Sequence, residues 1–185
     1  MFVYETFLYV IAALLKANSF LLLKNVFASR YLIAEPHTAP QLVGFGEFEG
    51  FSESLHILAP AGRRLLSPAA ELIKRQAQRS DLSFHEIMQA ELLILLMAFI
   101  TPEARWFPQT LHYTDHGTAF PFFIRAAQRR HFKNLAVMTG IDSADNLRAA
   151  VKTGHERMVT NQWHSLRWDR TFSSAMNLDK LDTLG

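Results

Sequence analysis

The chain contains no cysteine among its 185 residues. This absence excludes disulfides, thiolate zinc sites, iron–sulfur clusters and cysteine nucleophiles. It is compatible with a reducing compartment, and we expect a cytoplasmic protein. Glycine and proline are also sparse, at 8 and 7 residues, so turns should be few. The composition therefore favours helices over a β-sandwich with many turns.

The chain also lacks a strong net charge and a long apolar run. It has 19 Lys and Arg against 17 Asp and Glu, so any binding of nucleic acid requires a local basic patch. The apolar run from Phe7 to Leu15 lies between Glu5 and Lys16. It is about half as long as the ~20 residues that a membrane span needs. We therefore expect no membrane span here and interpret the run as a buried core helix, with a partner-binding helix as the alternative.

Apolar residues make up 49% of the chain and aromatic residues 12%, which indicates a folded core. Apolar spacing and helix boundary signals predict helices over residues 2–17, 20–29, 52–58, 68–79, 84–100, 119–138 and 144–158. The helical pattern fails over residues 31–50, where residues 41–50 are predicted as a short strand or an ordered loop. We expect a mainly α fold: a bundle of about five to seven helices around the apolar run Leu92 to Ile100, with an irregular or short β insertion near residues 31–50.

One helical domain is expected over residues 1–158, because no internal repeat or linker divides the chain. Residues 159–185 form a predicted C-terminal tail, which Trp163 and Trp168 would anchor. Two helix starts have clear signals. Ser67 precedes Pro68 as an N-cap, and Ser83 is followed three residues later by Glu86, the spacing of a capping box. Gly140 is the expected C-cap of the helix over 119–138.

The predicted helix over residues 119–138 has two different faces. At about 100° per residue, one face carries apolar residues together with His131. The other carries four cations: Arg125, Arg129, Arg130 and Lys133. Such a basic stripe could bind nucleic-acid phosphates or an acidic protein partner. The alternative is a solvated helix face without a ligand.

Five residues separate Arg125 from His131. This spacing resembles the Arg-x(4–6)-His motif of HEPN ribonucleases, which are all-α proteins. The resemblance implies that Arg and His of paired subunits would cleave RNA without a metal, with His131 as the acid–base group. The polar residue that commonly follows the motif's arginine is Ala126 here, which departs from the family pattern. His131 also falls on the predicted apolar face, so we prefer to interpret it as a histidine packed into the core, with the catalytic role as the alternative.

Other candidate sites are weaker. His112, Asp115 and His116 are close in sequence, but Gly117 and the aromatic residues before them indicate a loop without a third ligand at a suitable spacing. His85–Glu86 lacks the second histidine of a zinc-protease helix. Glu91, at the start of the apolar run, should be buried and held by an arginine or by backbone amides. No metal site and no cofactor are expected.

Longer segments carry a second resemblance: residues 106–113, 121–126 and 131–132, together with residues 5–31 and 83–91. They resemble helical modules, without an assigned activity, in multidomain bacterial proteins of defence type. The resemblance implies an accessory or sensing domain beside a separate effector. We therefore expect a non-enzymatic module that interacts with a protein partner or forms a homo-oligomer. The alternative is a HEPN-type RNase, or a nucleic-acid-binding domain, that uses Arg125 and His131.

Overall fold

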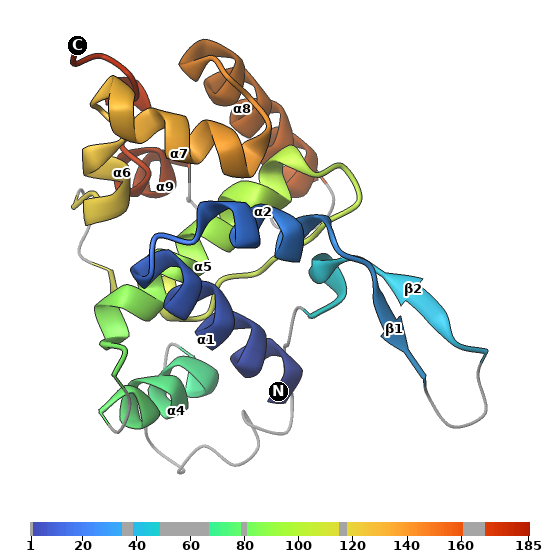
Figure 1. The fold of residues 1–185 in the computed structure, drawn as a ribbon. Coiled ribbons are helices and arrows are strands. Elements are labelled where there is room, and N and C mark those ends of the chain that lie inside the picture. Colours follow the sequence, from blue (N-terminus) through green and yellow to red (C-terminus); the bar gives the residue numbers. More distant parts are fainter. Residues whose placement is uncertain (1, 35–38, 49–66, 79–80, 115–117, 161–168) are drawn as a thin grey trace.

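A computed structural model describes residues 2–34, 39–48, 67–78, 81–114, 118–160 and 169–185. The chain is mainly helical, with one small antiparallel sheet, as the sequence predicts (Figure 1). The α-helices are α1 (Phe2–Lys16), α2 (Phe20–Ala28), α4 (Pro68–Ala77), α5 (Phe84–Ile100), α6 (Pro121–Arg125), α7 (Arg129–Thr139), α8 (Ala144–Thr160) and α9 (Asp169–Ala175). The remaining elements are strands β1 (Tyr31–Ile33) and β2 (Gln41–Val43) and the short 3-10 helices η1 (Phe45–Phe48), η2 (Thr110–Tyr113) and η3 (Leu178–Lys180).

Helix α5 is the centre of the molecule, as its apolar sequence predicts (Figure 1). Residues 90–99 are all buried, because α5 packs against both α1 and α8. Gly154 marks the crossing of α8 and α5, where a Cβ atom would overlap the backbone of Phe99. Arg157 of α8 donates to the carbonyls of Ala98 at 2.9 Å and Thr101 at 3.0 Å. It thereby satisfies carbonyl groups that the end of a helix leaves without partners.

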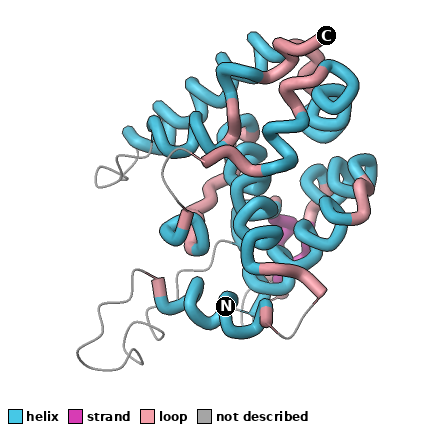
Figure 2. Tube along the Cα trace, turned by 90° about the vertical axis from the view of Figure 1, so that its left-hand side faces the viewer, coloured by secondary structure: helices cyan, strands magenta, loops and turns pink. Residues whose placement is uncertain are grey.

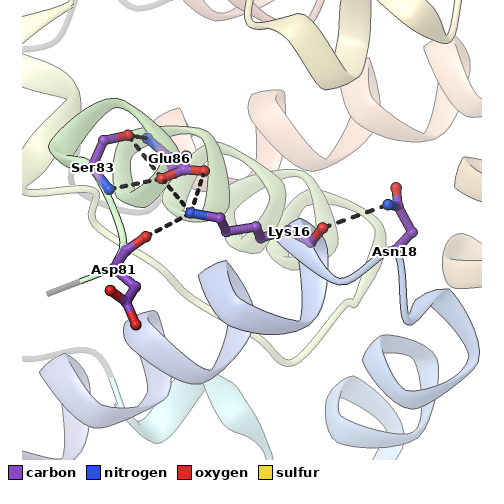
Figure 3. Close-up of polar contacts among 5 residues, drawn as sticks. All are labelled: Lys16, Asn18, Asp81, Ser83 and Glu86. Carbon is purple, nitrogen blue, oxygen red and sulfur yellow. Dashed lines mark hydrogen bonds and ion pairs between the residues drawn. The ribbon is translucent and has the colours of Figure 1, made fainter.

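The helix starts predicted at Ser67 and Ser83 are confirmed. The Ser83 hydroxyl accepts from the Glu86 amide at 3.2 Å, and the Glu86 carboxylate accepts from the Ser83 amide at 2.7 Å. This is the reciprocal pair of a capping box. Lys16, at the end of α1, contacts Glu86 at 3.2 Å and donates to the Asp81 carbonyl at 2.6 Å (Figure 3). The cap of α5 is therefore also the point at which α1 is attached to it.

Strands β1 and β2, which we call the hairpin, follow α2 and are themselves followed by the 3-10 helix η1. Strands β1 and β2 are antiparallel, and the hairpin projects away from the helices (Figure 1). Phe45 of η1 is buried and stacks on Phe7 of α1, with ring centroids 6.2 Å apart. For residues 41–50 the sequence predicts either a short strand or an ordered loop. The structure has a strand up to Val43 and then η1.

The single helix predicted over residues 119–138 is wrong. The structure has two helices, α6 and α7, with a break at residues 126–128. The C-terminal segment occupies this break: the Asp182 amide donates to the Ala126 carbonyl at 3.0 Å, and the Leu184 amide donates to that of Ala127 at 2.9 Å. These carbonyls bond to a distant segment instead of continuing the helix. Because the two helices do not share one set of faces, Ile124 of the predicted apolar face is 51% exposed.

The C-terminal segment also contributes to the core, since Phe172, Met176, Leu178 and Leu181 are buried. Gly140 ends α7 with a φ of 70°, the left-handed conformation expected of a C-cap glycine. The predicted helix over 52–58 and the anchors Trp163 and Trp168 lie outside the described residues. Within the described part of the chain, no helix is both long enough and apolar enough to span a bilayer.

Candidate functional site

The four predicted basic residues are all exposed, but they belong to two helices. Arg125 ends α6, Arg129 and Arg130 lie in the first turn of α7, and Lys133 follows one turn later. The first turn of α7 contains no acidic residue. A helix N-terminus carries partial positive charge, and two arginines there add to it instead of compensating it. The four cations therefore gather at the end of α6 and the start of α7 and do not form a stripe along one continuous helix.

Arg125 and His131 line the same pocket, which has a volume of about 200 Å³. Its other lining residues are Asn18, Phe20, Phe122 and Asn134. Asn18 lies in the turn between α1 and α2, with a φ of 54°, and Phe20 begins α2. The rings of Phe20 and Phe122 are 6.1 Å apart between centroids. The pocket thus joins the start of α2 to α6 and α7.

The chemistry of this pocket favours an anion. The described residues that line it contribute one guanidinium, one imidazole and two amide side chains, but no carboxylate. The ion pairs found in the described residues join Lys16 to Glu86, Arg30 to Glu103 and Arg148 to Asp145, so none of them neutralises Arg125. His131 is only partly buried, although the sequence placed it on the apolar face. Imidazole and guanidinium groups together can bind a phosphate and exchange a proton with it.

Asn18 and Asn134 were not among the residues predicted from the sequence. Asn134 is three residues after His131, so it lies on the same side of α7. That spacing was a usable signal. Asn18 had no comparable signal, because its place in the pocket depends on how α2 packs against α7.

No metal centre is found in the described residues, which contain no group of three His, Asp or Glu side chains able to hold an ion. His112 lies on η2, and burial lowers the pKa of its imidazole. Its predicted neighbours Asp115 and His116 lie outside the described residues. His85 is exposed and stacks on Phe120, with ring centroids 4.8 Å apart.

Glu91 is fully buried, as its place at the start of the apolar run predicts, and hydrogen bonds hold its carboxylate. Its carboxylate accepts from the backbone amides of Gln109 at 2.8 Å and Thr110 at 2.6 Å. The hydroxyls of Tyr4 and Thr110 also donate to it. Burial raises the pKa of Glu91, and these hydrogen bonds oppose that rise. The carboxyl group therefore attaches α1 and the segment before η2 to the central helix.

A different kind of surface lies on the hairpin. Leu32 of β1 and Leu42 of β2 are directly opposite each other in the register, and they are 67% and 68% exposed. Opposite residues of an antiparallel pair point to the same face, so the two leucines form one apolar patch. Leu21 and Leu22, at the start of α2, are also exposed.

The chain was compared with protein-family models, with curated proteins and with solved structures, and none of the three comparisons found a match. The two surfaces described above, one apolar and one basic, are therefore the basis for a function.

Proposed function

We propose that this protein is a non-enzymatic interaction module that uses its hairpin to bind a protein partner, as an accessory part of a bacterial defence system in the cytoplasm. The observation that carries the proposal is the pair Leu32 and Leu42 on the projecting hairpin (Figure 1). We call these two side chains the leucine patch. The defence context is supported by the resemblance of the sequence to accessory modules.

The leucine patch is costly for an isolated chain. Two leucines that are two-thirds exposed forgo a hydrophobic stabilisation of about 1 kcal/mol or more each. The rest of the chain covers only about a third of each leucine, because both lie on a two-stranded element that projects from the helices. Such a hairpin is only marginally stable alone, and packing of its apolar face on another surface stabilises it. Binding of a partner to this face would therefore bury the two leucines and stabilise the hairpin.

The hairpin is too small to support a dimer alone. Each strand has three residues, and two such hairpins facing each other bury far less than the roughly 1,000 Å² of a stable interface. We therefore propose a different protein with an apolar groove as the occupant. Association of two copies of this chain is the alternative outcome of the test.

The test is the double variant Leu32→Ser with Leu42→Ser. Light scattering on a sizing column measures self-association, and pull-down from the native host followed by reconstitution with the purified partner measures binding. We expect one stoichiometric partner whose binding falls by about tenfold or more in the variant and persists in high salt, because the contact is apolar. The control is Leu184→Ser, which removes a leucine of similar exposure, 56%, near the C-terminus.

Equal loss of binding in the control variant would contradict this function, because the effect would then not depend on the leucine patch. A self-association that disappears only in the double variant would replace the separate partner by a second copy. A chain that stays monomeric and forms no reconstituted complex would leave the hairpin without a binding role.

A second function is favoured by one observation: Arg125 and His131 line a single pocket to which no described residue contributes a carboxylate. This would fit a metal-independent RNase of HEPN type, with Arg125 holding a phosphate and His131 transferring protons. It would also fit a nucleic-acid-binding domain without cleavage.

For the RNase, we expect RNA cleavage in the presence of a chelator, and we expect this cleavage to be lost in the His131→Ala variant. If His131→Ala does not reduce cleavage, the RNase function is excluded. Salt-sensitive binding of RNA without cleavage would instead support a nucleic-acid-binding domain.

A further inference from the structure

A second cleft lies where α2 packs against α7, separate from the pocket of Arg125 and His131. Its volume is about 660 Å³, within the range of sites for small organic ligands. Lys24 of α2 lines it together with Arg129 and Lys133 of α7. The contact between the two helices thus brings a cation from the N-terminal hairpin of helices to the basic residues of α7. The sequence separates Lys24 from Arg129 by about a hundred residues, so no local pattern connects them.

The cleft holds three cations against the two carboxylates of Asp142 and Asp182, and none of the three cations forms an ion pair with a described residue. All three cationic side chains are exposed. Like charges gathered in a concave surface repel one another and attract an anion. The first turn of α7 adds the positive end of the helix dipole and has no acidic residue to offset it. Lysine and arginine side chains form strong charge-assisted hydrogen bonds with the oxygens of a phosphate group.

The other residues that line the cleft indicate which chemical groups the ligand carries besides its phosphate. Asp142 and Asp182 also line it, and neither forms an ion pair with its cations. Carboxylates accept hydrogen bonds from hydroxyl or amino groups, and they repel a second anion. Ala136 and Val137 supply an apolar wall, with Val137 exposed. A bare inorganic anion would use only the cations and would leave the carboxylates and this wall without a function.

We propose that this cleft binds a small phosphate ester that carries hydroxyl groups, of the size of a mononucleotide. Its phosphate contacts Lys24, Arg129 and Lys133, and its hydroxyls donate to Asp142 and Asp182. The site shares no lining residue with the leucine patch or with the pocket of Arg125 and His131. It gives an interaction module a means to respond to a metabolite.

The experiment is isothermal titration calorimetry on the full chain with AMP as the probe and inorganic phosphate as the comparison. AMP should bind more tightly than inorganic phosphate, because only AMP uses the carboxylates and the apolar wall. Lys24→Gln and Lys133→Gln should each weaken AMP binding by about tenfold. Asp142→Asn should weaken binding of AMP but not of inorganic phosphate. Since these side chains are exposed, the variants should keep the fold, which circular dichroism checks.

A control variant and a comparison variant define the site. Lys180→Gln removes an exposed lysine of η3 that does not line the cleft, and it should bind AMP like the wild type. His131→Ala removes a residue of the other pocket and tests whether AMP binds there instead. The proposal is overturned if AMP does not bind, if it binds no more tightly than inorganic phosphate, or if Lys24→Gln and Lys133→Gln bind it normally. Loss of binding in His131→Ala alone would move the ligand to the other pocket and would also overturn it.

Discussion

Glu91 connects three segments of the chain through one buried carboxyl group. Its partners come from α1, through Tyr4, and from the residues before and at the start of η2, through Gln109 and Thr110. Burial raises the pKa of Glu91 above its ordinary value of 4.5. The folded protein therefore holds the proton of this group more tightly than the unfolded chain does. By linkage, its contribution to the free energy of unfolding is fully present below pH 4.5 and is lost as the pH rises through the folded pKa.

Glu91→Gln tests this linkage. The amide cannot ionise, so the free energy of unfolding of the variant, measured by urea denaturation at several pH values, should lack this component. The difference between the wild type and the variant should therefore shrink as the pH rises. Glu91→Ala should cost about 2–4 kcal/mol, because it leaves buried donors without an acceptor. Glu47→Gln, at an exposed glutamate, is the control. Parallel pH curves for the wild type and Glu91→Gln would assign the pH dependence to other groups.

Single residues differ in how well the sequence predicts their positions. The burial of Glu91 follows from its place at the start of an apolar run, and its bonding to amides follows from the cost of burying a charge. The exposure of Arg125, Arg129, Arg130 and Lys133 follows from charge alone. Lys24 is different. Its place in a cleft with Arg129 depends on the packing of two helices that are distant in sequence, which no local pattern encodes.

At the scale of elements, Gly154 sets how closely α8 approaches α5. A Cβ atom there would overlap the backbone of Phe99, which cannot move aside as a flexible side chain could. We expect Gly154→Ala to destabilise the protein by about 3 kcal/mol or more, because the two helices must separate within a packed core. Thermal and urea unfolding measure the loss.

Gly140→Ala is the matched control for Gly154→Ala. Gly140 has a φ of 70° but open space around its Cα, so alanine there meets strain without a clash. It should cost only about 1–2 kcal/mol. If Gly154→Ala is less harmful than Gly140→Ala, the helices adapt to the extra methyl group, and the close approach is not required for stability.

Helix ends were predictable where a short-range signal exists, as at Ser67, Ser83 and Gly140. The break between α6 and α7 was not. The residues at the break, Ala126, Ala127 and Gln128, include no glycine or proline, and alanine is the best helix former. The break results from hydrogen bonds to residues 182–184, which compete with the helix. A tertiary contact of this kind overrides local preference, so the basic residues lie on two helices instead of one.

The molecule as a whole combines a well-packed centre with a projecting hairpin, and Figure 2 shows the same helical body from the side. Stability should therefore be uneven along the chain. The amides of α5 are buried between α1 and α8, so they should exchange with solvent only through global unfolding. The amides of β1 and β2 are held by three-residue strands, so they should exchange through local opening at a much lower free energy.

Hydrogen exchange followed by mass spectrometry measures this difference, and it also separates the proposed binding sites. A protein partner on the leucine patch should slow exchange in the hairpin, because covering Leu32 and Leu42 opposes its opening. AMP should slow exchange in α2 and the start of α7, which line the cleft of Lys24, and should leave the hairpin unchanged. Protection of the hairpin by AMP would show that the two surfaces are coupled, and the protein would then regulate its partner through the metabolite. Independent protection would assign them separate functions.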